Sequence, residues 1–320
     1  MVFTASNRLS EKQETCSPSN TRLKTRFQQF TYVLAGSTFA IFWASASAAT
    51  KIGLQFSQPF VMAIARFALA SVLMLTIAHG VLRQRLPTGR KIWTQLFLYG
   101  LLNITLYLGL YVVAMQEVSA GLGTLFVATN PVLILLINTL WFRQPIRTPT
   151  LLSFGLCIAG ILIAAYPLYQ ESHATVFGLS TLFLSMLCYS AGAIYFARQD
   201  WGDLHILTIN GWQTFIGGIC LLPFMLAVFD RSANVFNNTW LGSVAWLAIP
   251  VSIVAMLLWL YLLRDNPVNA SAWLFLCPIV GFAIAALWMN EPLSGYTFVG
   301  VLLVLAGLYL VQRMKCAQKN

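Results

Sequence analysis

Ten long apolar stretches, nearly free of charge, constrain the fold of this 320-residue chain more than any other feature. A helix needs about 20 mostly apolar residues to cross a bilayer, and each stretch has about that length. Because only 9% of the residues are charged, they could not cover the surface of a water-soluble protein of this size. The sequence therefore predicts an all-α integral membrane protein with ten transmembrane helices, over residues 31–50, 60–82, 93–114, 119–141, 149–168, 175–197, 206–228, 241–263, 268–289 and 294–312.

Basic residues lie mostly on one side of these expected spans. If residues 1–30 are cytoplasmic, 16 lysines and arginines fall on the cytoplasmic side and only Lys51 and Arg231 on the other. This asymmetry satisfies the positive-inside rule for an even number of spans, so the tails at 1–30 and 313–320 are both expected in the cytoplasm. The net charge of +10 then reflects topology, and no clustered basic surface indicates a nucleic acid partner. The first tail lacks the features of a cleavable signal peptide, and we expect a multi-pass protein of the cytoplasmic (inner) membrane.

The two halves of the chain repeat each other. Tyr111 aligns with Tyr261 at an offset of 150 residues, and Pro131, Pro145 and Gly160 align with Pro278, Pro292 and Gly307 at an offset of 147. The first repeat covers residues 31–170 and the second covers 171–312, each with five expected spans. Because five is odd, the second repeat enters the membrane from the opposite side. We therefore expect two inverted five-helix repeats around a central cavity.

Several motifs, taken in order, resemble the EamA group of the drug/metabolite transporter superfamily over residues 31–312. The opening pattern is similar at Phe42-Trp-Ala-Ser45, Lys51, Pro59 and Ala65-Arg-Phe67. The fourth span is similar at Val118-Ser-Ala-Gly121 and Thr129-Asn-Pro-Val132, and the closing hairpin at Asn290-Glu-Pro-Leu293, Gly300 and Gly307. The chain departs from the family pattern at Gln144, where the first repeat would usually carry a glutamate like Glu291 in the second. The resemblance implies a ten-span secondary transporter of small organic metabolites, amino acids in some members, with export as the expected direction.

Polar and aromatic side chains inside the apolar stretches are the candidates for contact with a solute. Binding pockets are mostly apolar with a few hydrogen-bonding groups, and spans 3 and 4 offer such groups. Asn103, Tyr107 and Tyr111 recur every four residues and share one helical face. The ten predicted substrate-binding residues are Trp43, Ser47, Arg66, Asn103, Tyr107, Asn130, Tyr189, Trp212, Gln213 and Trp259. For each aromatic residue, packing between helices stays open as an alternative.

Some charged residues lie within or beside the spans, and a structural role is weighed for each of them. Arg66 is the charge deepest in a span: its guanidinium either faces a wet cavity and attracts a carboxylate or phosphate, or is structural, capping carbonyls or snorkelling to the interface. Lys51 is expected to snorkel to the interface from the end of its span. Glu291 is expected to cap the span that begins near residue 294.

Other functions have less support. None of the nine acidic residues lies in the middle third of an expected span, so the sequence gives no direct indication of proton coupling. A membrane-embedded enzyme would need clustered histidines or carboxylates, and a channel would more naturally lack inverted halves. The nearest alternative is a nucleotide-sugar or phosphate-ester antiporter, which would need basic residues in its cavity besides Arg66. We therefore expect no enzyme activity, metal or cofactor. The expected partners are a small-molecule substrate and the lipid bilayer, with the protein as a monomer or weak homo-oligomer.

Overall fold

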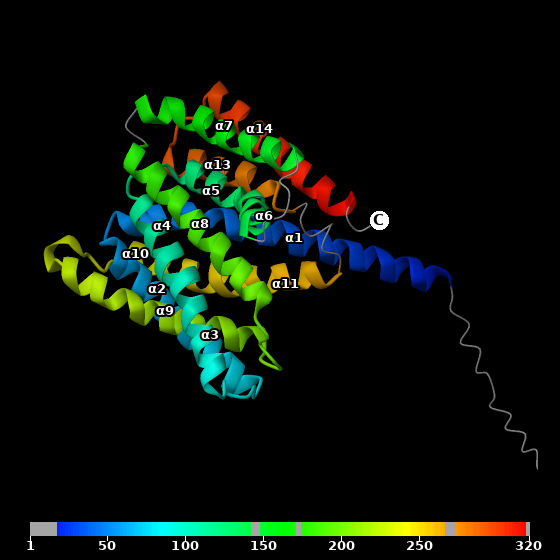
Figure 1. Cartoon of the computed structure of the whole chain (residues 1–320), viewed down its shortest axis with the longest axis vertical. Helices are drawn as coiled ribbons and strands as arrows, with labels where there is room; N and C mark the ends of the chain where they lie inside the picture. The colour runs from blue at the N-terminus through cyan, green and yellow to red at the C-terminus, as the bar shows by residue number, and fades with distance from the viewer. Residues whose placement is uncertain (1–17, 142–147, 171–173, 266–272, 318–320) are drawn as a thin grey trace, which may run out of the picture.

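The computed structural model describes residues 18–141, 148–170, 174–265 and 273–317. In these ranges the chain forms helices joined by short loops (Figure 1). Its one described β-pairing is an isolated bridge between Val118 and Ala174. The predicted all-α class is therefore confirmed for this part of the chain. The helices pack side by side into one bundle, in which segments far apart in the sequence are neighbours.

The helices follow the expected spans closely. In the first half they are α1 (Pro18–Leu54), α2 (Pro59–Leu75) with η1 (Thr76–Val81), α3 (Arg90–Gly100) with η2 (Leu101–Leu108) and α4 (Gly109–Ala114), α5 (Ala120–Ala128), α6 (Asn130–Trp141) and α7 (Thr148–Gln170). In the second half they are α8 (Val176–Arg198), α9 (Ile206–Val228), a short turn η3 (Arg231–Ala233), α10 (Asn238–Trp246) with η4 (Leu247–Val254) and α11 (Ala255–Asp265), α13 (Leu276–Met289) and α14 (Gly295–Ala317).

Eight of the described helices, some built from consecutive segments, are long and apolar enough to cross a membrane. The pair α5 and α6 passes the same test but is bent by 42°, and counts as a ninth span if the two cross together. The expected span 268–289 is represented by α13, which has 14 residues, and positions 268–272 lie outside the described residues. The chain is thus a multi-pass membrane protein, while the count of ten remains a prediction.

The bend between α5 and α6 lies at Thr129, Asn130 and Pro131. Proline has no N–H to donate to the preceding turn, so the regular ladder of main-chain hydrogen bonds stops there. The N–H groups of Val132 and Leu133 both donate to the carbonyl of Thr129, at 3.0 and 3.2 Å, which starts the second helix. The break therefore occurs between two apolar helices, where interrupted backbone in a membrane protein is tolerated if it is covered by protein or faces a cavity.

Three described segments are π-helical, η1, η2 and η4, and two of them, η2 and η4, occupy corresponding places in the two halves. Each of these two is eight residues long and follows a helix that begins after a loop. π-Helical turns are rare and are often found at functional sites, because the wider turn changes the direction of nearby side chains and releases carbonyl groups. In η4, the hydroxyl of Ser252 donates to Leu247 O at 2.8 Å, five residues earlier.

Helices from the two halves pack in reciprocal pairs. α7 lies against α14, and α2 lies against α9, in each case the same numbered span of the two expected repeats. A Cβ atom placed on Gly160 would be 2.6 Å from the carbonyl oxygen of Gly300, and one placed on Gly307 would be 2.8 Å from that of Ser153. The two contacts are equivalent: Gly307 lies 147 positions after Gly160, and Ser153 lies 147 positions before Gly300. Small residues thus let the backbones of α7 and α14 touch.

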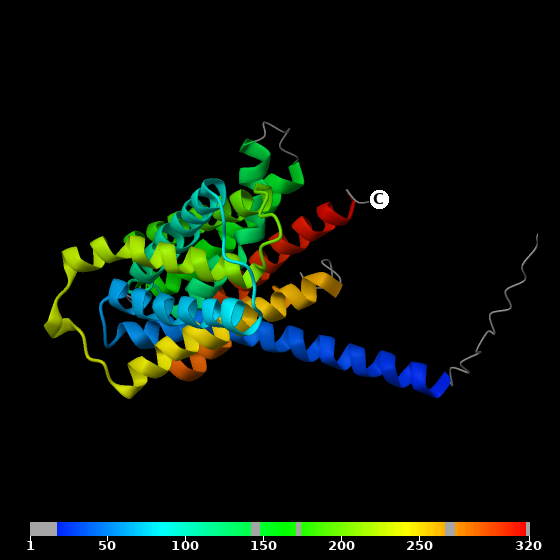
Figure 2. The same ribbon diagram turned by 90° about the horizontal axis from the view of Figure 1, so that it is seen from below.

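Both described ends of the chain lie at the same end of the bundle. The start of α1 and the end of α14 are on one side in two perpendicular views, and the loop that joins α9 to α10 is on the other (Figures 1 and 2). This is the arrangement expected of an even number of crossings. Below, the two sides are called the terminal end and the distal end of the bundle.

Candidate functional site

A cavity of about 990 Å³ lies at the centre of the bundle and is lined by helices from both halves. This volume is at the upper limit of ordinary small-molecule pockets, about 300–1,000 Å³. Nine of the ten predicted substrate-binding residues line it: Trp43, Ser47, Arg66, Asn103, Tyr107, Asn130, Tyr189, Gln213 and Trp259. The structure thus brings these nine side chains to one space, and their contact with a solute remains a prediction.

Arg66, on α2, is the one charged residue among the described residues that line the cavity. It is 7% exposed, and both its Nε and its Nη2 donate to the hydroxyl oxygen of Ser252 on η4, at 3.3 and 3.1 Å. The guanidinium is therefore held from the opposite half of the protein by a neutral acceptor. Among the described residues no carboxylate pairs with it, although a buried charge is expensive unless it is paired or hydrated.

A hydroxyl cluster fixes the wall formed by α1, α4 and α5. The hydroxyls of Ser47 and Tyr111 are 2.8 Å apart, and Thr124 Oγ1 donates to Ser47 Oγ at 3.0 Å. All three side chains are buried and line the cavity. Their mutual hydrogen bonds satisfy groups that would otherwise be costly to bury, and leave this wall rigid.

An amide chain forms a second polar wall, between η2 and α9. Asn103 Nδ2 donates to Gln213 Oε1 at 3.2 Å, and Gln213 Nε2 donates to Asn210 Oδ1 at 3.0 Å. Asn210 Nδ2 in turn donates to the carbonyl of Ile206, one turn earlier on α9, at 3.0 Å. This chain links the two halves along one wall of the cavity and orients amide groups beside it.

Asn130 lies at the break between α5 and α6. It is 5% exposed and lines the cavity, and its Oδ1 has no hydrogen-bond partner within the described chain. A buried polar atom without a partner is unusual, because leaving it unpaired costs about 1–3 kcal/mol. Asn130 therefore borders the cavity, but its Oδ1 is itself covered by protein in this conformation.

Aromatic rings cover much of the remaining wall. Phe39 and Trp259 stack with ring centroids 5.0 Å apart and planes 23° apart, and Trp43 packs against Phe39 at 5.8 Å. The rings of Tyr107 and Tyr189, which also line the cavity, are 4.9 Å apart. Rings arranged in this way provide flat, mostly apolar surfaces on both repeats.

Trp212 lies outside the residues that line the cavity, so the structure separates it from the other nine candidates. Its indole Nε1 donates to Nε2 of His79 at 3.1 Å, and its ring meets Trp93 edge-on at 4.9 Å. Trp212 thus joins α9 to η1 and α3. Its neighbour Gln213 faces the cavity because successive residues of a helix point about 100° apart.

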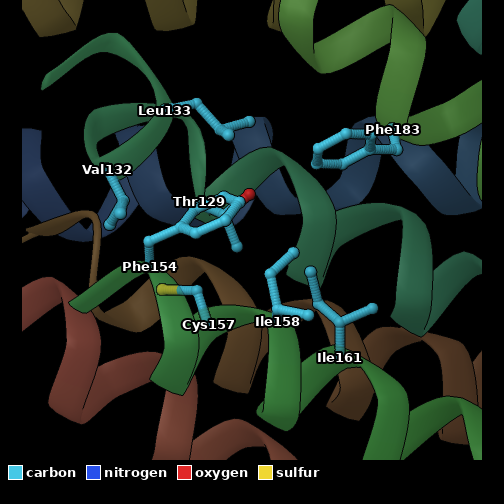
Figure 3. A pocket seen from close by; sticks show the side chains of 8 residues that line it. All are labelled: Thr129, Val132, Leu133, Phe154, Cys157, Ile158, Ile161 and Phe183. Atoms are coloured by element: carbon cyan, nitrogen blue, oxygen red, sulfur yellow. The ribbon is translucent and has the colours of Figure 1, made fainter. Parts of the chain in front are cut away.

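A much smaller void, of about 10 Å³, lies behind the break between α5 and α6. Figure 3 shows its lining, in which side chains of α7 face those of α6 and α8: Phe154, Cys157, Ile158 and Ile161 from α7, Val132 and Leu133 from α6, and Phe183 from α8. The hydroxyl of Thr129, beside this void, donates to the carbonyl of Phe126 at 2.7 Å. An apolar space of this size holds at most one water molecule and is a packing defect rather than a second site.

The cavity extends toward the terminal end of the bundle. Its lining reaches Gln312 near the end of α14, and Phe196 and Ile206 on either side of the loop between α8 and α9. Toward the distal end it stops at Tyr111 and Thr124, and the next layer of α4 and α5 is almost completely buried. In this conformation the protein is thus closed at the distal end.

Lys51 and Glu291 belong to this distal layer, and both contact the start of α5. Lys51 Nζ donates to the carbonyl of Val118 at 2.6 Å. Glu291 accepts from the N–H groups of Ala120 and Gly121, at 2.6 and 3.1 Å. The expectation that Glu291 caps the following span was wrong, since Ser294 Oγ accepts from Thr297 N–H there at 3.3 Å. Lys51 reaches a carbonyl of the first repeat instead of simply extending to the interface.

Sequence reasoning missed some residues of the site. Ser252 lies in an apolar stretch, and nothing in the sequence marks it as a site residue. Only its hydrogen bond with Arg66 in the structure shows its role. In the sequence, Phe39 cannot be told apart from other buried aromatic residues. The structure shows that it lines the cavity, where its ring stacks on Trp259. The one available signal was the need of Arg66 for an acceptor, which could have directed attention to hydroxyls in the opposite half.

A protein-family model described as the EamA-like transporter family matches the chain twice, at residues 30–166 and 176–313. The chain belongs to the EamA-like transporter family. This confirms the resemblance seen in the motifs. In this EamA-like transporter the π-helical segments η2 and η4 begin at Leu101 and Leu247, 146 positions apart, and the two matches begin at 30 and 176, with the same spacing. These two π-helical segments are therefore equivalent features of two homologous halves.

Curated relatives with similar sequences include transporters from several organisms. Protein PecM of Dickeya dadantii is 27% identical over 278 residues, which cover 84% of this chain and 88% of PecM. A probable amino-acid metabolite efflux pump of Escherichia coli is 23% identical over 282 residues, which cover 84% of this chain and 91% of the pump. A solved crystal structure matches with a TM-score of 0.60 at 16% identity, covering 91% of this chain and 99% of that one, which supports the fold alone.

The side chains that commonly hold a metal ion are those of histidine, cysteine, aspartate and glutamate. No group of three or more of these side chains lies together in the described residues. Cys157, Cys188, Cys220 and Cys277 are free thiols. The chemistry available in the central cavity is therefore hydrogen bonding, one positive charge and aromatic surface, which suits reversible binding of a solute.

Proposed function

We propose that this EamA-like transporter is a secondary transporter that moves small organic metabolites, amino acids or related solutes, across the cytoplasmic membrane by alternating access. The observation that carries the proposal is the cavity of about 990 Å³, which is lined by polar and aromatic residues of both halves. Names of relatives agree with this class of function, since one is a probable amino-acid metabolite efflux pump. Export is accordingly the proposed direction.

Alternating access has support from the way the halves pack. The reciprocal contacts of Gly160 with Gly300 and of Gly307 with Ser153 are those of two units related by a two-fold exchange. Inverted repeats related in this way can adopt two arrangements of similar energy, each open to one side of the membrane. The conformation described here, which extends to the terminal end and is closed at the distal end, is proposed as the inward-facing one.

Transport is tested by counterflow into liposomes that contain the purified protein. Vesicles loaded with an unlabelled amino acid or organic acid should transiently accumulate the same labelled solute above its external concentration. Empty liposomes, and liposomes with protein denatured before reconstitution, are the controls. Failure to find counterflow with any of a broad set of small metabolites would contradict the proposed function.

The direction of opening is tested by labelling single cysteines in a background from which the native cysteines are removed. Gln312 and Val127 line the cavity at its terminal end and at its middle, respectively. A maleimide that cannot cross the membrane should label Gln312→Cys and Val127→Cys in inside-out vesicles. In right-side-out vesicles Val127→Cys should be labelled more slowly, as the transporter cycles. Labelling of Gln312→Cys only from outside would reverse the proposed orientation, in which both termini are cytoplasmic.

The alternative within transport is a nucleotide-sugar or phosphate-ester antiporter. Such substrates carry two or more negative charges, and their sites use several basic residues. Arg66 is the single charged group among the described residues that line this cavity. This observation favours a substrate with no more than one negative charge, and adenosine monophosphate or a sugar phosphate should fail to compete in the counterflow assay.

A further inference from the structure

The described residues that line the cavity carry one positive charge and no negative charge. Arg66 contributes a positive charge, and no aspartate, glutamate or histidine is among the described residues that line the space. A guanidinium has five N–H donors, and two of its nitrogens are directed at Ser252 Oγ. Within the described chain Nη1 donates to no acceptor. The protein therefore leaves part of a buried, planar cation available for a negative group that the chain itself does not supply.

A carboxylate is the group that matches this arrangement. Arginine binds a carboxylate through two parallel N–H···O bonds because the spacing of its donors matches that of the two oxygens. One carboxylate also balances the single charge, whereas a phosphate ester near neutral pH brings up to two negative charges. The single positive charge of the cavity thus matches a solute with a single negative charge.

The rest of the site fits a flat apolar body attached to that carboxylate. Ser252, which holds Arg66, and Trp259 are seven residues apart on consecutive helical segments, about 10 Å at the rise of a helix. Trp259 stacks on Phe39, which also contacts Trp43. A solute held at Arg66 by its carboxylate can therefore place a ring against this aromatic wall with a linker of a few bonds.

An ammonium group has no matching charge in the site. The polar groups around the cavity are hydroxyls and amides, most of which already bond one another. Asn130 Oδ1 has no partner, but it is a neutral atom and is covered by protein, so it offers an ammonium no charge. Removing the amino group of a solute should thus lose little, while removing its carboxylate should lose the only charge pairing available.

We propose that the cavity binds small organic acids with a single carboxylate on a flat, apolar ring system, and that an α-amino group is not required for recognition. This rests on the proposed function, because it identifies the same cavity as the substrate site. Arg66 holds the carboxylate, and the wall formed by Phe39, Trp43 and Trp259 holds the ring. The class includes aromatic amino acids but is broader, since it depends on the acid and the ring.

Three probes with the same indole ring and the same two-carbon linker separate the two charged groups of such a solute. Indole-3-propionate keeps the ring and the carboxylate, tryptamine keeps the ring and the amine, and tryptophan keeps all three. Their affinities for the wild-type protein in lipid nanodiscs are measured by calorimetry near pH 7. Indole-3-propionate should bind within about threefold of tryptophan, and tryptamine at least about tenfold more weakly, the loss expected when a buried charge pair is broken.

Two results would overturn the proposal. If tryptamine binds as tightly as indole-3-propionate, the rings attract a cation and the carboxylate is not recognised. If tryptophan binds more than tenfold tighter than indole-3-propionate, the ammonium is recognised and the substrates are zwitterions. Both results come from the wild-type protein, so neither depends on whether a variant folds.

The role of Arg66 is tested with Arg66→Gln and a matched variant, Arg90→Gln. Both changes remove one positive charge, but Arg90 is exposed at the start of α3 and away from the cavity lining. Wild type and Arg90→Gln should prefer indole-3-propionate over its neutral amide by at least about tenfold. Arg66→Gln should bind the two equally. A preference that persists in folded Arg66→Gln would exclude Arg66 as the carboxylate site, and if this variant does not fold, the wild-type comparison of acid and amide decides whether a carboxylate is recognised.

Counterflow distinguishes failure of this inference from failure of the proposed function. If liposomes show counterflow of solutes that lack a carboxylate as readily as of indole-3-propionate, the protein is a transporter and the substrate class is wrong. If calorimetry shows binding of indole-3-propionate and no solute shows counterflow, the ligand class stands and the transport function fails.

Discussion

The carboxylate of Glu291 accepts a hydrogen bond from the main-chain N–H of Ala120 at 2.6 Å, although the two residues are 171 positions apart. Its second oxygen accepts from Gly121, so one side chain of the second repeat caps α5 of the first. The first turn of a helix has unpaired N–H groups and a partial positive charge. A carboxylate accepts hydrogen bonds from these N–H groups and also balances the charge. This contact fastens the two halves at the distal end of the bundle.

Replacing Glu291 should therefore lower stability. Glu291→Ala leaves the two N–H groups of α5 without their acceptors and should reduce the free energy of unfolding by about 1–2 kcal/mol, the typical value of a charged cap. Glu291→Gln keeps one acceptor oxygen and should lose about half as much. The thermal midpoint in detergent is the measurement, and Glu117→Gln, at an exposed carboxylate nearby, is the control. Equal midpoints for wild type and Glu291→Ala would contradict the capping role.

The close approach of α7 and α14 predicts different effects of two glycine substitutions on one helix. A Cβ on Gly160 would lie 2.6 Å from the carbonyl of Gly300, whereas one on Gly155 would meet nothing within 4 Å. Gly160→Ala should force the helices apart and destabilise the protein by about 1–3 kcal/mol. Gly155→Ala should be neutral or stabilising by up to about 1 kcal/mol, because alanine is the better helix former. Similar thermal midpoints for both variants would show that the two helices separate easily.

Trp259 and Trp212 should respond differently to loss of the ring. Trp259 lines the cavity, while Trp212 donates to His79 outside it. Trp259→Leu should weaken binding of indole-3-propionate about tenfold, as expected for a lost aromatic contact and its buried surface. Trp212→Leu should lower the thermal midpoint and leave the affinity within about twofold. If Trp212→Leu weakens binding and Trp259→Leu lowers only the thermal midpoint, Trp212 and not Trp259 contacts the solute.

The contrast between these two tryptophans also shows what the sequence can and cannot predict. Apolar length gave the helices, and the cost of polar groups in a membrane identified residues such as Asn103 and Gln213 that do line one cavity. Trp212 is adjacent to Gln213, and when polar and aromatic residues follow each other on a helix, composition alone does not tell which one faces inward. The decision depends on packing against η1 and α3, which pattern analysis does not contain.

The sequence also could not predict contacts between distant residues or local departures from α-helical geometry. Glu291 was expected to act on the helix that follows it, because caps are local in most helices, but it reaches a helix that the fold brings near. The π-helical segments η2 and η4 have no evident sequence signal, since a wider turn in an apolar stretch leaves the hydrophobic pattern almost unchanged. Ser252 is placed by one of these segments, so its role could not be read before the structure.

Ser252 is expected to position Arg66. Its hydroxyl accepts from Nε and Nη2 of the guanidinium and donates to the carbonyl of Leu247. Ser252→Ala should leave the guanidinium free to rotate and reduce the affinity for indole-3-propionate about threefold to tenfold, as expected for one hydrogen bond to a charged group. It should also narrow the preference for the acid over its neutral amide, which a purely structural role would not change. Ser243→Ala, at a buried serine in the same span, is the control.

Arg66→Lys separates the two interpretations of Arg66, since it preserves the charge and removes the planar fork. A lysine ammonium can neutralise a carboxylate, but it cannot hold Ser252 and present two parallel donors to a solute at the same time. If Arg66 holds the carboxylate, the variant should fold with a thermal midpoint within a few degrees of wild type and bind indole-3-propionate about tenfold more weakly, the difference between a bidentate and a single charge-assisted hydrogen bond. If Arg66 only fastens α2 to η4, the midpoint should fall while the affinity of the folded fraction stays near wild type. Calorimetry and thermal unfolding of the same nanodisc preparation decide between the two outcomes, and we expect the first, because Nη1 has no acceptor in the described chain and the side chain lines the cavity.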